Sequence, residues 1–106
     1  MTGPGTGAAE RVQLHQVLSA LQDPVRLEMV RRLSNAGVPL QCAALYDGIN
    51  KSTATHHFKI LREAGLIERQ ITDGLTHQRL RTDAIDAEIP GLLASIVTRA
   101  NEEAGL

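Results

Sequence analysis

The order of apolar and polar positions along the chain predicts a mainly helical fold with one pair of short strands. Five segments place their apolar residues at helical spacing: residues 10–21, 24–34, 42–49, 52–64 and 84–104. After Gly65 apolar and polar residues alternate instead, which predicts two strands on either side of Asp73 and Gly74. An Asp-Gly pair suits a tight hairpin turn because both residues accept positive φ. Residues 38–40 are expected to be extended because they include Pro39.

Single residues mark where several of these helices begin and end. Asp23 is expected to cap the second helix, and Pro24 fits its first turn, where no amide hydrogen is needed. Gly37 is expected to close that helix because glycine adopts positive φ at helix ends. Ser52 is the expected cap of the fourth helix, and Pro90 interrupts the last helical segment.

The composition indicates one small domain with an aliphatic core. The 106 residues are 42% hydrophobic but only 2% aromatic. Residues 1–9 are rich in Gly and are expected to form a flexible arm, which leaves residues 10–104 as the folded domain. No apolar run reaches the length of about 18 residues that indicates a membrane span, and the first residues lack the pattern of a signal peptide. We therefore expect a cytoplasmic protein with no membrane partner.

Charge is distributed unevenly along the chain, although the net charge is only −1. Residues 51–81 hold six Lys and Arg against three Asp and Glu, together with three of the four His. Residues 82–106 hold one Arg against five acidic residues. A small DNA-binding protein needs a locally basic surface rather than a basic chain. Residues 51–81 are therefore the candidate nucleic-acid surface.

Two stretches carry a specific resemblance to a known family. Residues 21–27, LQDPVRL, look like the L-x-D-P-x-R-L start of the second helix in ArsR-type repressors. Residues 52–66, STATHHFKILREAGL, resemble the recognition helix of the same family, S-x-x-S-x-H-L-x-x-L-x-x-A-G-L. The chain thus resembles the ArsR-type (ArsR/SmtB) winged helix-turn-helix transcriptional repressors over residues 10–104. The resemblance implies a mainly α fold with a small β-hairpin wing.

The same resemblance implies a homodimer that is joined through its first and last helices. Each subunit of such a dimer places one recognition helix in the major groove of an inverted-repeat DNA duplex. The apolar stripes of these two helices are wider than a small core needs, which favours a dimer surface. The alternative is that both helices cover the core of a monomer. The expected interface residues are Val12, Leu14, Val17, Leu18, Leu92, Leu93, Ile96 and Val97.

The outward face of the fourth helix and the basic hairpin supply the expected DNA contacts. They are Lys51, Ser52, Thr53, Thr55, His56, His57, Lys59, Arg62, Arg69, His77 and Arg79. Ser52 either only caps the helix or also brings backbone amides toward a phosphate. His57 either binds a phosphate or fills a half-buried niche. Among Arg69, Arg79 and Arg81, at least one is expected to contact a phosphate.

The metal sites of the family are not reproduced in this sequence. Cys42 stands alone where some relatives have a Cys-x-Cys pair, and residues 82–106 contain no His. Because zinc sites draw about four ligands mainly from Cys and His, we expect no metal and no cofactor. An organic effector is left open. Cys42 is either a buried thiol that packs as a small hydrophobe or the centre of a redox sensor.

The expected function is sequence-specific DNA binding by a dimeric transcriptional repressor. The rival function is a winged-helix module that binds protein or RNA. An enzyme is not expected, because Cys42, His56 and His57 lie on different helical faces and no carboxylate pair accompanies them.

Overall fold

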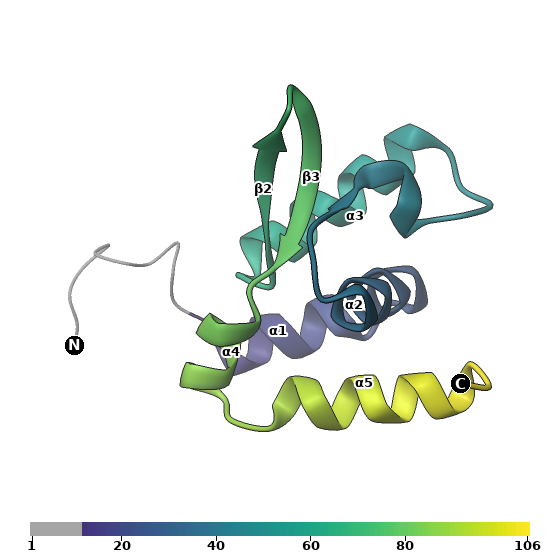
Figure 1. Cartoon of the computed structure of the whole chain (residues 1–106). Coiled ribbons are helices and arrows are strands. Elements are labelled where there is room, and N and C mark those ends of the chain that lie inside the picture. Colours follow the sequence, from purple (N-terminus) through teal and green to yellow (C-terminus); the bar gives the residue numbers. More distant parts are fainter. Residues whose placement is uncertain (1–11) are drawn as a thin grey trace.

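Five α-helices, one 3₁₀ helix and three strands follow one another in the computed structural model, which describes residues 12–106 (Figure 1). They are α1 Leu14–Leu21, α2 Pro24–Ala36, β1 Leu40–Gln41, η1 Cys42–Leu45, α3 Lys51–Glu63, β2 Ile67–Thr72, β3 Leu75–Leu80, α4 Thr82–Glu88 and α5 Leu92–Glu103. The arm expected at residues 1–9 lies outside the described residues. So does the start of the first expected helix, at residues 10 and 11.

Helix α2 occupies the centre of the fold and packs against α1, α3 and α5. Figure 1 shows α5 along one side of the molecule, while the β2–β3 hairpin projects from the opposite side. The core between the helices is aliphatic, as the composition predicts. Its largest fully buried side chains are Met29, Leu45, Leu61, Leu66, Ile67, Ile85, Val17 and Val30.

The three strands form an antiparallel sheet in the order β1-β3-β2. The hairpin β2–β3, called the wing below, closes at a two-residue turn in which Asp73 and Gly74 have φ of 53° and 78°. Positive φ at both positions confirms the turn predicted from the Asp-Gly pair. The register pairs Thr72 with Leu75 and, further along, Glu68 with Arg79. The extended stretch predicted at 38–40 ends in β1, which pairs with β3.

The predicted start, cap and closing glycine of α2 are confirmed, and the helix continues to Ala36, two residues beyond the predicted end. The Asp23 carboxylate accepts hydrogen bonds from the backbone amides of Val25 and Arg26, and Pro24 is the first residue of the helix. At the other end Gly37 adopts a left-handed conformation with φ 69°, and its amide donates to the carbonyl of Leu33.

The predicted cap of α3 was wrong by two residues. Asn50 is the N-cap, because its side-chain oxygen accepts a hydrogen bond of 2.8 Å from the amide of Thr53. The helix therefore begins at Lys51, and Ser52 lies inside its first turn.

The helix predicted at residues 42–49 is only the four-residue 3₁₀ helix η1, and its backbone becomes extended at Tyr46. Two contacts explain the early end. Arg32 on α2 donates to the carbonyl of Ala44 and pairs with the Asp47 carboxylate at 2.6 Å. Gly48 then has φ 73°, which is not helical.

The last helical segment is divided into α4 and α5. Pro90 lies between them, as expected, and Gly91 turns the chain with φ 84°. Among the described helices, none is long and apolar enough to cross a membrane.

Candidate nucleic-acid interface

Helix α3 has one buried face and one polar face that is open to solvent. Ala54, Phe58 and Leu61 are buried in the core. Ile60 is half-buried and packs against the same core. The exposed members of the polar face include Lys51, Ser52, Thr53, Thr55, His56 and Lys59. A helix that is fixed on one side and polar on the other is suited to a DNA groove.

Phe58 and Tyr46 together hold α3 against the segment that precedes it. The ring of Phe58 is only 4% exposed. Its centroid lies 6.2 Å from that of Tyr46, and the two rings meet edge to face. The polar face of α3 therefore keeps a defined orientation relative to η1.

The start of α3 directs backbone amides toward the surface. Asn50 satisfies the amide of Thr53, whereas the amides of Lys51 and Ser52 have no acceptor within the helix. These amides and the positive end of the helix dipole favour an anion such as a phosphate. The Thr55 hydroxyl donates to the carbonyl of Lys51 at 2.9 Å, which leaves the oxygen of Thr55 able to accept from a base edge.

His57 occupies a half-buried niche between α2 and α3. Its Nδ1 lies 3.0 Å from Nη1 of Arg26. Because a guanidinium can only donate, Nδ1 accepts this hydrogen bond and the proton of the neutral ring is on Nε2. Arg26 also donates from Nε to the carbonyl of Ala20 on α1. The structure thus places His57 in the niche that was one of its two expected positions, and Arg26 connects three helices.

The arginines of the wing differ in how much of their charge is already paired. Nε and Nη2 of Arg79 lie 3.0 and 2.9 Å from Oε2 of Glu68 on the neighbouring strand. Arg81 donates to the carbonyl of Gly65 at 2.7 Å. Arg69 is exposed, and its side chain has no hydrogen bond or ion pair within residues 12–106. Arg69 is therefore the wing cation most available to a phosphate.

The other two basic residues expected at the interface are half-buried. They are Arg62, near the end of α3, and His77, on β3. Nδ1 of His77 lies 3.1 Å from the carbonyl oxygen of Leu75.

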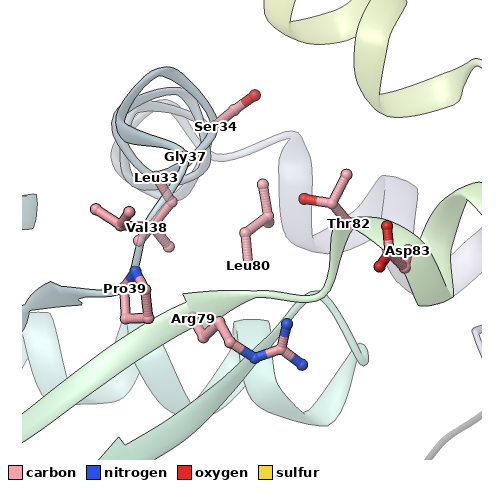
Figure 2. A pocket seen from close by; sticks show the side chains of 9 residues that line it. All are labelled: Leu33, Ser34, Gly37, Val38, Pro39, Arg79, Leu80, Thr82 and Asp83. Atoms are coloured by element: carbon pink, nitrogen blue, oxygen red, sulfur yellow. The ribbon is translucent and has the colours of Figure 1, made fainter. Parts of the chain in front are cut away.

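Figure 2 shows how neighbouring residues of β3 point to opposite sides of the sheet. Leu80 projects into a hollow of about 230 Å³ between the end of α2 and the start of α4. The Arg79 guanidinium lies on the other side of the strand (Figure 2). Arg79 also lines this hollow, and its guanidinium is directed away from Leu80 (Figure 2).

The residues expected at a dimer interface fall into two groups. Val12, Val17, Leu93 and Val97 are buried within a single chain, so their side chains already pack in its core. Leu92 and Ile96 are half-buried, whereas Leu14 and Leu18 are 53% and 46% exposed. The surface left for a partner therefore comes from these last four residues.

Cys42 is half-buried, and its Sγ lies 3.6 Å from Nε2 of Gln78. Gln78 itself is buried, and its side-chain oxygen has no hydrogen-bond partner in the described chain. Within residues 12–106 no three His, Cys, Asp or Glu side chains lie close enough together to hold a metal ion.

The comparisons with known proteins agree with this architecture. A family model described as "Helix-turn-helix domain" matches residues 21–70. The chain is 36% identical over 83 residues to the Bacillus subtilis (strain 168) protein named "Uncharacterized HTH-type transcriptional regulator YceK", covering 76% of this chain and 83% of that one.

Two solved structures have a similar fold. The transcriptional repressor BigR from Xylella fastidiosa superposes with a TM-score of 0.61 at 25% identity, covering 89% of each chain. The crystal structure of an ArsR family transcriptional regulator matches with a TM-score of 0.59 at 18% identity, covering 99% of this chain and 97% of that one.

The fold and the polar helix define a winged helix-turn-helix protein that binds DNA. The chain belongs to the helix-turn-helix-type transcriptional regulators, and its motifs at residues 21–27 and 52–66 resemble those of the ArsR type. Members of this family are DNA-binding regulators and not enzymes.

Sequence reasoning missed three residues that shape this interface. Asn50 is as good a cap as Ser52, so residue type alone did not decide between them. Glu68 lies opposite Arg79 because the two-residue turn sets the register, so this pair could also have been found. The contact of Arg26 with His57 depends on how α2 and α3 cross, and no sequence signal indicated it.

Proposed function

We propose that the protein is a homodimeric, sequence-specific transcriptional repressor whose α3 helix enters the major groove. One observation carries this proposal: Thr55, His56 and Lys59 lie exposed on a helix whose opposite face is anchored by Phe58 and Leu61. Hydroxyl, imidazole and ammonium groups at the groove can hydrogen-bond base edges and phosphates.

The start of α3 and the wing are proposed to contact the DNA backbone. The amides of Lys51 and Ser52 and the ammonium of Lys51 would bind one phosphate. Arg69 would bind another, with Arg79 in a lesser role because Glu68 already neutralises it. Such contacts position the protein on the duplex without selecting a sequence.

A dimer through α1 and α5 is supported by the exposed Leu14 and Leu18 together with the half-buried Leu92 and Ile96. Helix α5 lies on the side of the molecule away from the wing (Figure 1), so this arrangement leaves the wing free for DNA. Two recognition helices related by a dyad then require half-sites about one helical turn, roughly 34 Å, apart.

A repressor role is supported by the similarity to BigR, which is named a transcriptional repressor. We propose that this protein works without the metal sites of its family, because Cys42 has no second thiol in the chain. Because its proposed partner is DNA, we propose that the protein acts in the cytoplasm.

Selection of binding sites from random duplexes tests the proposal. The expected result is one preferred sequence with twofold symmetry, protected in a footprint over two adjacent half-sites. Binding that shows no sequence preference, or a stronger affinity for single-stranded RNA at every salt concentration, would contradict it.

A further inference from the structure

A hollow of about 460 Å³ lies between η1, the first half of α3 and the turn end of β3. Its walls include the side chains of Tyr46, Ala54, Phe58 and Leu75, so most of its lining is apolar. Pockets for small organic molecules have volumes of about 300–1,000 Å³ and combine apolar walls with a few polar groups. This hollow has the size and the walls of such a pocket.

Lys51 is the only charged residue among the described residues that line this hollow. It lies in the first turn of α3 and is exposed, and its ammonium group makes no ion pair or hydrogen bond within residues 12–106. The positive end of the α3 dipole adds to the positive electrostatic potential around Lys51. An apolar hollow with a single cation at its edge complements an apolar molecule that carries one negative charge.

We propose that this hollow binds a small monocarboxylate with an apolar body, such as a medium-chain fatty acid or an arylalkanoate. The carboxylate pairs with the Lys51 ammonium, and the body packs against Tyr46, Phe58 and Leu75.

The position of the hollow connects such a ligand to DNA binding, an inference that rests on the proposed function. Lys51 and Thr55 line the hollow and also belong to the polar face of α3. A carboxylate on Lys51 competes with the DNA phosphate for the same cation. Loss of one phosphate contact per subunit removes about 0.9 from the salt slope, or about fivefold in affinity per subunit at 0.15 M salt. The ligand is therefore expected to weaken DNA binding.

Tyrosine fluorescence offers a direct test without DNA. Tyr46 is the one tyrosine of the chain, which has no tryptophan, so emission reports this hollow. Titration with sodium octanoate and with 4-phenylbutyrate should change the emission in a saturable manner. Octanamide, which has the same body without the charge, should bind at least tenfold more weakly.

Matched variants test separately how the charge of Lys51 and the walls of the hollow contribute to ligand binding. Lys51→Gln should reduce octanoate affinity to that of octanamide, while Lys59→Gln, a cation on the same helix that does not line the hollow, should leave it unchanged. Ala43→Leu narrows the hollow from η1 and should abolish binding with the charge intact. Circular dichroism checks that each variant is folded.

Each outcome bears on one part of the inference. No saturable change with either carboxylate up to its solubility limit would overturn the site, and equal affinity for octanamide would overturn the role of Lys51. If octanoate binds but the protein holds DNA equally well, the competition is wrong while the site stands. If the ligand-free protein shows no sequence-specific DNA binding, the proposed function fails independently of these titrations.

Discussion

Nη1 of Arg26 lies 3.0 Å from Nδ1 of His57 and so connects the start of α2 to α3. The same guanidinium donates from Nε to the carbonyl of Ala20 at the end of α1. One side chain thus sets the relative positions of three helices. The Asp-Pro-x-Arg stretch therefore does more than begin α2.

Replacing Arg26 with leucine should destabilise the fold. Hydrogen bonds from a charged donor contribute about 1.5–3 kcal/mol each, so the loss of these two should lower the free energy of unfolding by about 3 kcal/mol or more. Urea denaturation measures it. Arg99→Leu is the control, because Arg99 forms only exposed pairs with Glu102 and Glu103, worth under about 1 kcal/mol. If the free energy of unfolding falls equally in the two variants, Arg26 has no special role in stability.

Glu28 should make stability depend on pH in the acidic range. Hydrogen bonds from Arg31 and then Arg32 lower the pKa of Glu28 from 4.5 to about 2. Because the folded-state pKa lies below the unfolded one, the contribution of Glu28 is complete above pH 4.5 and is lost as the pH falls to about 2.

The test compares the wild type with Glu28→Gln. The difference between their free energies of unfolding should be largest near neutral pH and should shrink through the acidic range. Other carboxylates titrate in both proteins and cancel in this difference. A difference that stays constant with pH would mean that Glu28 is not held by the two arginines.

The dimer is tested by placing charge on α1. Leu14→Glu combined with Leu18→Glu should produce a monomer, because two carboxylates would have to be desolvated at the interface. Sedimentation equilibrium separates the 11.4 kDa chain from its dimer. Val38→Glu changes an equally exposed apolar residue on another surface and should remain dimeric. If the α1 variant sediments as a dimer, the interface lies elsewhere.

Arg69 and Arg79, two arginines of the wing, should differ in their contribution to DNA binding. Arg69→Gln should weaken binding to operator and scrambled duplex alike and lower the salt slope by about one. Arg79→Gln should have a smaller effect on affinity, because Glu68 already neutralises Arg79 at 2.9 Å. Titrations at several salt concentrations measure both slopes. A larger loss for Arg79→Gln would show that DNA displaces Glu68.

Much of the fold could be predicted because its signals are local. The cap at Asp23, the left-handed Gly37 and the Asp73-Gly74 turn each depend on neighbouring residues only, and the structure confirms them. The polar face of α3 followed from helical periodicity in the same way. The early end of η1 was missed because Arg32 contacts it from another helix, although Gly48, with φ 73°, was a local signal.

Individual side-chain partners were less accessible to sequence reasoning. Whether His57 faces DNA or α2 depends on the angle at which two helices cross. Similarly, the burial of Val17 and Val97 within one chain depends on how closely α1 and α5 cover the core. Periodicity identifies an apolar stripe but does not say which of its residues a second subunit covers.

The polar face of α3 is tested most directly by Thr55→Ala and His56→Ala. Both residues are exposed, and Phe58 and Leu61 hold the helix, so the fold should survive both changes. A lost base contact costs about 1–3 kcal/mol on the operator and little on random duplex. Arg99→Ala on α5 serves as a control that should bind both DNAs like the wild type.

The decisive measurement is the ratio of operator affinity to scrambled-duplex affinity for these variants at one fixed salt concentration. The account predicts that this ratio falls roughly 5- to 150-fold in Thr55→Ala and His56→Ala, as about 1–3 kcal/mol requires, and is unchanged in Arg99→Ala. If both recognition-helix variants lose affinity equally for the two duplexes, α3 does not select the DNA sequence and the account is wrong.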